Sequence, residues 1–275
     1  MTPDVSIFIP VWNRPRMVAQ AIESVLNQTY KNFTLIVSDN CSTDNTRDVI
    51  AKYASRDHRV VLRVQERNVG GTENGNRFLR TVNTPFCMLL CSDDLLIEND
   101  AIQKARAIMD KYPEVASVYC DLLFVDEDVN PLATRRFSRK GLLDSRMLAI
   151  KSIYTTRNYF GIALLNRTDR MRGLQYEESS GYAADVDASI ATAKDLPVYH
   201  IPEVLIANRF HGSNYTISLL SHARRDMLTV ARKHGIHLSL IDYLKQMWFF
   251  PTTLLMKYAF FSFLNLRRKW KHLLK

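Results

Sequence analysis

Residues 88–96 read Met-Leu-Leu-Cys-Ser-Asp-Asp-Leu-Leu, and this stretch decides the expected fold. A short, continuous apolar run is typical of a strand that is buried on both faces of a parallel sheet. The run ends in two adjacent acids, Asp93 and Asp94, which therefore lie at the carboxyl end of that strand. Open α/β sheets bind their ligands at this end. The pair favours a divalent-metal site beside a phosphate-bearing substrate, although Asp is also common in solvated turns.

Apolar strands and helical patterns alternate over the first 120 residues. Strands are expected at 5–11, 34–38, 60–64, 88–90 and 115–120, and helices at 15–26, 49–53, 68–82 and 99–112. Alternation at these lengths predicts an α/β protein with a doubly wound, mostly parallel central sheet flanked by helices. The chain lacks both a GxGxxG after the first strand and a GxxxxGK[ST], which disfavours a dinucleotide-binding Rossmann domain and a P-loop enzyme.

Charge and cysteine content restrict the partners of the chain. The net charge is +9, but residues 209–275 hold twelve Lys/Arg and two Asp/Glu, so the preceding 208 residues carry only −1. A basic terminal segment is typical of proteins that bind nucleic acid or an anionic membrane. The four cysteines show no CxxC or His-paired zinc spacing, and the N-terminus has no signal-peptide pattern. Both features favour a cytoplasmic protein with reduced thiols.

Five segments in order resemble one family. They are VSIFIPVWNRP from residue 5, SVLNQTY from 24, VSDNCSTDNT from 37, NVGG from 68 and CSDD from 91. This series is similar to the nucleotide-binding half of family 2 glycosyltransferases, which have the GT-A fold. The resemblance covers residues 4–120 well and extends more weakly to about residue 215. It implies a nucleotide-sugar donor, usually a UDP-sugar, a divalent metal, Mn²⁺ or Mg²⁺, and inversion at the anomeric carbon.

The resemblance assigns nucleotide-binding roles residue by residue. Pro10, Val11 and Asn13 match the base-pocket loop, and Asn13 can also cap the helix that begins at Pro15. Asp39 matches the acid that contacts uracil or ribose, and Asp44 lies in the same loop with a less defined role.

Two further segments complete the predicted nucleotide site. Asn68 and Gly71 match the loop that closes on the nucleotide. Asp93 and Asp94 match the end of the family's DxDD-type motif. Cys91 stands where many members have the first Asp, and thiols are poor ligands for Mg²⁺ or Mn²⁺. We therefore expect the metal on Asp94 and the ribose on Asp93, and metal independence stays open as an alternative.

The second half of the chain carries the predicted catalytic base. Gly181-Tyr-Ala-Ala-Asp185-Val-Asp187 resembles the family's acidic helix start, with Ala184 in place of the first acid. Asp185 aligns with the general base and Asp187 is the fallback. A first-turn Asp can also serve only to stabilise its helix.

A later segment, Arg209-Phe-His211-Gly-Ser-Asn, resembles the family's closing segment over the diphosphate. Arg209 is expected to offset the charge of the diphosphate, and His211 to coordinate the metal or touch the pyrophosphate. Arg135, Arg136, Arg139 and Lys140 make a basic stretch that either contacts a phosphate-bearing acceptor or is a solvated loop face.

The C-terminal segment combines aromatic and basic residues. An amphipathic helix is expected at 217–235, followed by an apolar stretch at 247–266 that Pro251 and Lys257 interrupt, and then a basic cluster. This pattern is typical of a helix lying in the interface of an anionic membrane, and the alternative is a helix packed on the domain. We expect a GT-A domain at 1–215, with a nucleotide-binding half (1–120) and an acceptor half (121–215), and an extension at 216–275.

These observations predict an inverting, metal-dependent glycosyltransferase that acts on a glycan or lipid-linked acceptor. By analogy with the family, it serves bacterial surface-polysaccharide assembly at the inner face of the cytoplasmic membrane, without binding nucleic acid. The alternatives are a non-catalytic nucleotide-sugar or glycan-binding module, which Cys91 and Ala184 favour, and a nucleotidyltransferase. The latter usually needs a Gly-rich basic loop that residues 10–14 lack.

Overall fold

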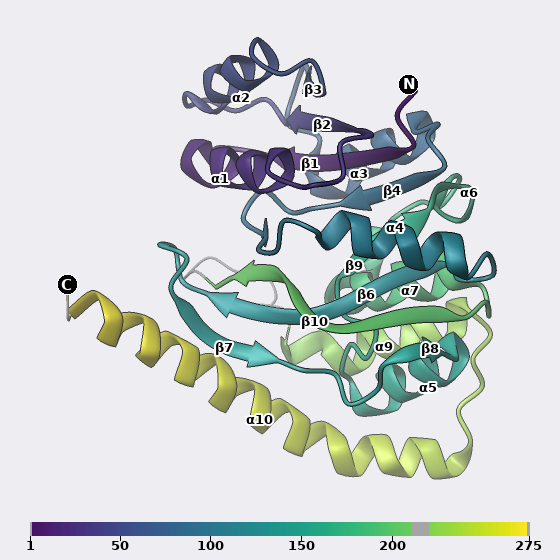
Figure 1. Cartoon of the computed structure of the whole chain (residues 1–275). Helices are drawn as coiled ribbons and strands as arrows, with labels where there is room; N and C mark the ends of the chain where they lie inside the picture. Colours follow the sequence, from purple (N-terminus) through teal and green to yellow (C-terminus); the bar gives the residue numbers. More distant parts are fainter. Residues whose placement is uncertain (1, 211–219, 274–275) are drawn as a thin grey trace.

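The computed structural model describes residues 2–210 and 220–273 of the 275-residue chain. One ten-stranded sheet runs through the molecule, with helices on both faces (Figure 1). The strands are β1 (Val5–Val11), β2 (Phe33–Asp39), β3 (Val60–Val64), β4 (Phe86–Leu89), β5 (Leu95–Leu96), β6 (Ser117–Val125), β7 (Pro131–Arg135), β8 (Gly141–Leu143), β9 (Ala163–Arg167) and β10 (Val198–Arg209).

Nine α-helices and two 3₁₀ turns connect or follow these strands within the described ranges. The first part of the chain contributes α1 (Pro15–Leu26), α2 (Thr46–Ala54), α3 (Gly70–Thr81), α4 (Ala101–Lys111), α5 (Ser145–Thr155) and α6 (Thr168–Met171). The remainder contributes η1 (Glu178–Ala183), α7 (Ala184–Ala193), η2 (Leu220–His222), α9 (Ala223–Lys233) and α10 (Leu240–Leu273).

The order of strands in the sheet is β3-β2-β1-β4-β9-β6-β10-β5, with β7 beside β6 and β8 beside β10. Strands β1 to β4 are mutually parallel, β9 is antiparallel to both of its neighbours, and β10 is parallel to β6. The sheet is therefore mostly parallel, which confirms the predicted fold class. The antiparallel strand β9 joins the half of the sheet that holds β1 to β4 to a second half that holds β6 and β10.

Apolar residues of β1 point alternately to the two faces of the sheet, as the pleat of a strand requires. Ile7 and Ile9 pack in a core with α1, α2 and α4, whereas Phe8 stacks on Phe78 of α3 on the opposite face. Helix α1 buries Val18, Ala21, Ile22 and Val25, a spacing that places all four on one helical face. Each large side chain buried in this way contributes about 1.5–3 kcal/mol to folding.

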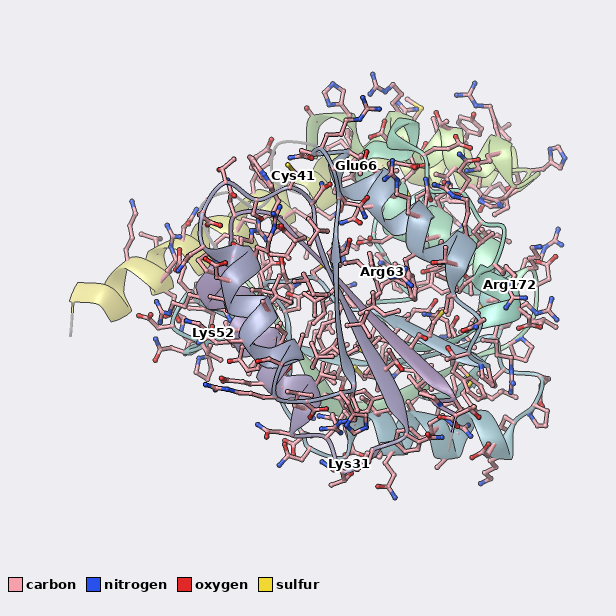
Figure 2. All side chains as sticks on the ribbon, turned by 90° about the horizontal axis from the view of Figure 1, so that it is seen from above. Lys31, Cys41, Lys52, Arg63, Glu66 and Arg172 are labelled. Atoms are coloured by element: carbon pink, nitrogen blue, oxygen red, sulfur yellow. The ribbon has the colours of Figure 1, made fainter. Side chains whose placement is uncertain are left out.

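The register of the parallel strands brings their carboxyl ends to one edge. Val11 lies opposite Asp39, and Asp39 lies opposite Val64, so the loops after β1, β2 and β3 leave the sheet together. Figure 2 shows Cys41 and Glu66 at this edge, while Lys31, which precedes β2, lies at the opposite end. Parallel sheets bind ligands at this edge, so the fold places the predicted nucleotide loops where a site is expected.

Strand β10 was not expected from the sequence, although it pairs with β6 along most of its length. Pro202 and Glu203 interrupt its apolar pattern, and the register shifts between Ile201 and Val204. Proline cannot donate a hydrogen bond to the ladder, so this strand lacks the uninterrupted run that identifies a buried strand. The expected helix at 217–235 is observed from Ala223 to Lys233, and residues 217–219 lie outside the described residues.

Helix α10 forms the C-terminal extension and lies along the outside of the second half of the sheet (Figure 1). It packs against α5 and β7, where Gln246 donates a hydrogen bond to the Ile153 carbonyl and Arg268 pairs with Glu127 at 2.6 Å. No helix within the described residues is both long and apolar enough to span a membrane. The contacts with α5 and β7 dock the helix on the domain, and its remaining face is exposed.

Candidate active site

The loops after β1, β2 and β3 are joined by side-chain hydrogen bonds. Asn13 has a φ of 52°, and its side chain exchanges hydrogen bonds with Thr43 in the loop after β2. Asn40 donates to the side-chain oxygen of Asn68 at 2.8 Å and accepts from the backbone of Val69 at 3.0 Å. Three of the predicted nucleotide segments therefore form one connected surface.

Asn13 and Asp44 both accept hydrogen bonds from backbone groups in or directly after the loop that follows β2. Asn13 does not cap α1, because its side chain is used by Thr43, and Arg14 occupies the cap position instead. Asp44 accepts a hydrogen bond from the backbone of Thr46 at 3.0 Å, so it stabilises the start of α2. Both are short polar residues in a loop, and sequence alone does not show which backbone group each will reach.

Asp39 lies at the end of β2 and is fully buried. One carboxylate oxygen accepts from the backbone of Ser42 at 3.0 Å, and the other accepts from Arg47 at 3.2 Å. The carboxylate therefore fixes the shape of the loop that follows it. Pro10 and Val11 lie at the end of β1, and Gly71 lies in the first turn of α3 with open space where a Cβ would stand.

Asp93 and Asp94 occupy a turn after β4, closed by a hydrogen bond from the Asp94 backbone to the Cys91 carbonyl. Asp93 pairs with Arg14 at 2.9 Å. Asp94 is buried and accepts hydrogen bonds from the Asn208 side chain and the Arg209 backbone, both at 3.1 Å. Burial and the neighbouring Asp93 charge hold the pKa of Asp94 well above its usual value.

The Arg209 side chain supports this turn from below. It is 1% exposed, and its guanidinium donates to the carbonyls of Asp93 at 2.9 Å and Glu127 at 2.7 Å and to the Gln20 side chain at 2.9 Å. A buried guanidinium with three oxygen partners positions the backbone around it. Its contacts therefore tie β10 to the turn after β4. His211, the other predicted residue of this segment, lies outside the described residues.

The donor set of this turn fits a hard divalent cation. Two adjacent carboxylates raise the cost of ionising each other, and a divalent ion would relieve this cost. Oxygen ligands are those that Mg²⁺ and Mn²⁺ prefer. Within the described ranges, no three His, Cys, Asp or Glu side chains surround a common metal position. An ion held by Asp94 would thus need ligands beyond these side chains.

Asp185 stands in the first turn of α7 and faces the same region as Cys91. Both side chains are reached by solvent, yet the surrounding protein raises the pKa of each. For Cys91, burial is the main cause, and the charges of Asp94, Asp93 and Asp185 raise its pKa further. Cys91 therefore lies within electrostatic range of both acidic segments. The fold brings together the end of β4 and the start of α7, which are about 90 residues apart.

Asp187 has a different environment, although it lies only two residues further along α7. It is buried and accepts hydrogen bonds from Ser180 at 2.5 Å, Lys233 at 2.9 Å and His234 at 2.6 Å. Burial alone would raise its pKa, but the donors, led by His234, lower it to about 2. Asp187 therefore links α7 to α9 as a permanently ionised carboxylate near neutral pH.

Gly181 and Asp226 set the start of α7. The backbone of Tyr182 donates to Asp226 at 2.9 Å, and Gly181 has a φ of +47°. A Cβ on Gly181 would lie 2.4 Å from an Asp226 oxygen, so only glycine fits. The contact between this turn and α9 therefore fixes the position from which Asp185 projects.

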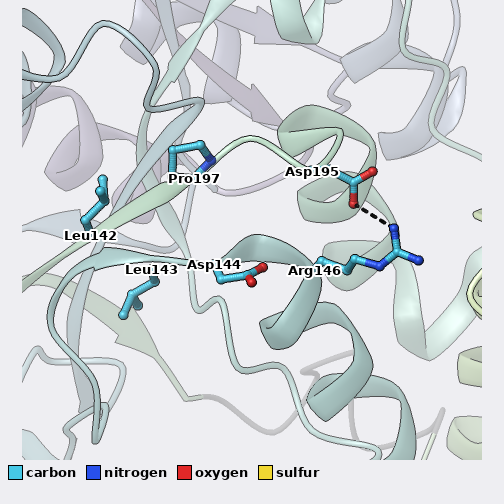
Figure 3. Close-up of a pocket in the computed structure, with 6 residues that line it drawn as sticks. All are labelled: Leu142, Leu143, Asp144, Arg146, Asp195 and Pro197. Atoms are coloured by element: carbon cyan, nitrogen blue, oxygen red, sulfur yellow. Dashed lines mark ion pairs between the residues drawn. The ribbon is translucent and has the colours of Figure 1, made fainter.

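A pocket that the described residues outline lies away from this site. It has a volume of about 480 Å³ and is lined by residues 142–146 together with Asp195 and Pro197 (Figure 3). Arg146 and Asp195 form a loose ion pair across it, with a separation of 3.9 Å. None of the predicted site residues lines this pocket, and Asp144 there accepts from the Met147 backbone as the cap of α5. It is therefore not the candidate active site.

Sequence reasoning gave no role to Arg14 or Asn208, which contact the acidic turn directly. Arg14 lies in the loop that resembles the family, and its charge was the available signal. Asn208 had no such signal, because it lies in β10, whose pairing was not predicted.

Comparison with known proteins shows the family of the chain. The family model "Glycosyl transferase family 2" matches residues 6–172. The chain is 25% identical to an Escherichia coli chondroitin synthase over 245 residues, which covers 88% of this chain but 34% of that protein. The chain therefore spans about a third of the length of this relative.

Two solved structures share the fold. S. aureus TarS, in complex with UDP-GlcNAc, has a TM-score of 0.65 at 17% identity and covers 89% of this chain and 69% of its own. The mannosyltransferase PcManGT from Pyrobaculum calidifontis, in complex with GDP-Man and Mn²⁺, has a TM-score of 0.59 at 14% identity and covers 98% and 88%. The fold is that of GT-A glycosyltransferases. The chain belongs to glycosyl transferase family 2, which confirms the predicted family and enzyme class.

Proposed function

We propose that the chain transfers a sugar from a nucleotide-sugar donor to a hydroxyl group of a glycan or lipid-linked acceptor, with inversion. One observation carries the proposal. The charges of the acidic turn after β4 and of the solvent-reached Asp185 in α7 both raise the pKa of Cys91, so the two acidic segments lie around one side chain although they are far apart in the chain. A site with a donor-side acid pair and an acceptor-side base is what a single displacement requires.

The donor is proposed to be a UDP-sugar. The related TarS structure holds UDP-GlcNAc, whereas the PcManGT structure holds GDP-Man, so both nucleotides occur on this fold. In this chain the joined loops around Asn13, Asn40 and Asn68 would receive the base and ribose, and Asp39 would hold the loop in shape. Asp93 would contact the ribose. The resemblance of these loops to UDP-dependent members favours UDP.

Asp185 is proposed as the general base. Its pKa is raised by burial, which makes the carboxylate a stronger base near neutral pH. It would remove the acceptor proton as the new C–O bond forms and the bond to UDP breaks, a contribution of about 10²–10⁴-fold. Asp187 is the weaker candidate, because three donors already engage its oxygens.

Asp94 is proposed to hold Mn²⁺ or Mg²⁺ beside the donor diphosphate, with His211 as a further ligand. When bound, the ion would stabilise negative charge on the departing UDP. Arg209 would act through the backbone of Asp93, which it holds in place, and its positive charge lies behind the turn. This role modifies the expected direct contact between Arg209 and the diphosphate.

The chain is further proposed to act at the inner face of the cytoplasmic membrane. Helix α10 exposes a set of large apolar side chains on the face that does not contact the domain: Leu240, Ile241, Leu244, Met247, Trp248, Leu255, Phe263 and Leu266. Apolar residues of this kind beside a basic cluster are typical of an interfacial helix. Such attachment would suit a lipid-linked acceptor in surface-polysaccharide synthesis.

The test is the Asp185→Asn variant, assayed for release of UDP from UDP-GlcNAc and other UDP-sugars. The amide keeps the shape of the side chain but cannot accept the proton. We expect UDP release to fall by about 10²–10⁴-fold while calorimetric UDP binding stays unchanged. Unchanged turnover would reject Asp185 as the base. Normal UDP binding without turnover by the wild-type chain, with a range of acceptors, would favour the non-catalytic binding module.

A further inference from the structure

Three cations from three separate elements meet next to the start of α7. Arg135 at the end of β7 donates a hydrogen bond to the Asn158 carbonyl, and Lys257 of α10 donates to the Thr156 carbonyl at 2.6 Å. Arg157 lies between these two carbonyls in the chain, and its guanidinium contacts Met256 of α10 at 3.2 Å. The three side chains therefore surround a single short loop.

This basic cluster, defined as Arg135, Arg157 and Lys257, has no acidic partner among the described side chains. All three are partly buried, and the ion pairs among the described residues involve other side chains. Burial and the neighbouring charges of Arg157 and Arg135 lower the pKa of Lys257 to about 7. Burial also lowers the pKa of Arg135. Partly desolvated cations without a counter-charge are costly, and an anionic ligand would remove the cost.

The cluster lies on the acceptor side of the proposed active site. Lys257 also donates to the Tyr182 hydroxyl and stands 4.3 Å from the centre of the Tyr182 ring. Tyr182 precedes Asp185 by three residues, and the charge of Asp185 contributes to the raised pKa of Tyr182. The strongest charges near Asp94 are instead Asp93 and Arg209. The cluster is therefore separate from the turn proposed to receive the donor diphosphate.

We propose that Arg135, Arg157 and Lys257 form a subsite for a phosphate group carried by the acceptor. The inference rests on the proposed function, since it assigns the acceptor side of the same site. Two guanidinium groups and an ammonium on separate stems can surround a tetrahedral anion with several oxygens. A carboxylate offers two oxygens in one plane and would leave part of the cluster uncompensated.

The cluster gives the C-terminal helix a role in substrate binding. Lys257 comes from α10, so the extension supplies one of the three cations, while the opposite face of the same helix is apolar and exposed.

The experiment is a calorimetric titration of the whole chain with inorganic phosphate, with UDP and Mg²⁺ already bound at the donor site. Lys257→Gln and Arg135→Gln each remove one cation of the cluster. Lys269→Gln removes one exposed cation from the same helix and is the matched control. We expect phosphate binding to weaken about tenfold or more in the first two variants and to be unchanged in the control.

Separate readouts distinguish this subsite from the donor site. UDP binding and thermal unfolding are measured for every variant, and both should match the wild-type chain within error. Equal phosphate affinity in all variants, or no phosphate binding by the wild-type chain, would overturn the subsite. If UDP fails to bind, the proposed function fails. The phosphate titration is then repeated without UDP, and the affinities of the variants are compared in the same way.

The source of the phosphate is tested with vesicles of phosphatidylcholine with and without phosphatidic acid. If the phosphate belongs to a lipid, phosphatidic acid should increase binding, and Lys257→Gln should reduce that increase more than Lys269→Gln does. Equal reduction by both variants would show only general attraction to an anionic surface. It would overturn a lipid source and leave a soluble phosphate-bearing acceptor.

Discussion

Asp185 and Asp187 are chemically identical, stand two residues apart, and have opposite environments. The pKa of Asp185 is raised because protein displaces water around it, whereas hydrogen bonds from His234, Ser180 and Lys233 lower the pKa of Asp187 to about 2. The first environment suits a group that accepts a proton, and the second suits a fixed charge that holds two helices together. The sequence could place both acids in the first turn of a helix, but it could not assign these environments, because Lys233 and His234 lie 46 and 47 residues away.

The environment of Asp187 predicts a stability effect. Replacing Asp187 with Asn leaves buried donors without their anionic partner, so we expect the free energy of unfolding to fall by about 2–4 kcal/mol near neutral pH. Because the folded pKa of Asp187 is lowered to about 2, its contribution is present above the unfolded value of about 4 and is lost as the pH falls toward 2. Urea unfolding across this range measures it, and a constant difference between the two proteins would contradict the assignment.

The environment of Asp185 predicts the acid limb of the pH profile. A general base works only when ionised, and burial raises the pKa of this carboxyl above the usual value of about 4. We therefore expect turnover to decrease as the pH falls through that raised pKa. The residual turnover of Asp185→Asn should not show this decrease. Initial rates of UDP release over a pH series measure this. A limb at or below about pH 4 would be inconsistent with a base whose pKa is raised.

At the scale of elements, the pattern of the sequence predicted the parallel half of the sheet and β6 of the second half, but not β7, β8 or β10. Strands β1 to β4 are short, mostly apolar runs with amphipathic helices between them, so the hydrophobic pattern identified them. Strand β10 has a proline and shifts in register, and β7 and β8 are short, so their pairing depends on partners distant in the chain. The acidic turn was predicted from β4, but its contacts with Asn208 and Arg209 depend on β10 and were not.

The turn before α7 gives a prediction about how this helix is held. Gly181→Ala would place a Cβ 2.4 Å from Asp226 at a φ of +47°, so we expect a loss of about 2–4 kcal/mol in the free energy of unfolding and reduced turnover of the folded fraction. Gly235→Ala is the control, because Gly235 has a φ of +61° but open space around the added carbon. This control should lose only about 1 kcal/mol. Equal losses in both variants would show that the Asp226 contact has no effect.

At the scale of the whole molecule, charge and apolar surface are concentrated in the C-terminal part. Residues 209–275 carry a formal charge of +10, and α10 exposes apolar side chains along one face while its other face packs on α5 and β7. The sequence analysis left open whether this segment packs on the domain or binds a membrane. The structure shows the packing, and the free face leaves membrane binding as a compatible proposal.

Membrane binding through this face has a direct test. Trp248 on α10 is 78% exposed, and Trp12 in the loop after β1 is 50% exposed, so the two offer a matched pair of substitutions. Trp248→Ala should lower affinity for anionic vesicles by about tenfold, because an interfacial indole is lost, and Trp12→Ala should have little effect. Vesicle sedimentation measures both. Equal affinities for the three proteins would exclude this face as the membrane contact.

The most direct measurement of the central claim is calorimetric binding of UDP, with GDP and dTDP as controls, in the presence and absence of Mn²⁺. A nucleotide-sugar transferase with its donor site at the ends of β1 to β4 should bind UDP more tightly than the other two nucleotides. Mn²⁺ should strengthen this binding, Asp94→Ala should remove the effect of the metal, and Asp185→Asn should leave UDP binding intact. A folded wild-type chain that binds none of the three nucleotides would contradict the account.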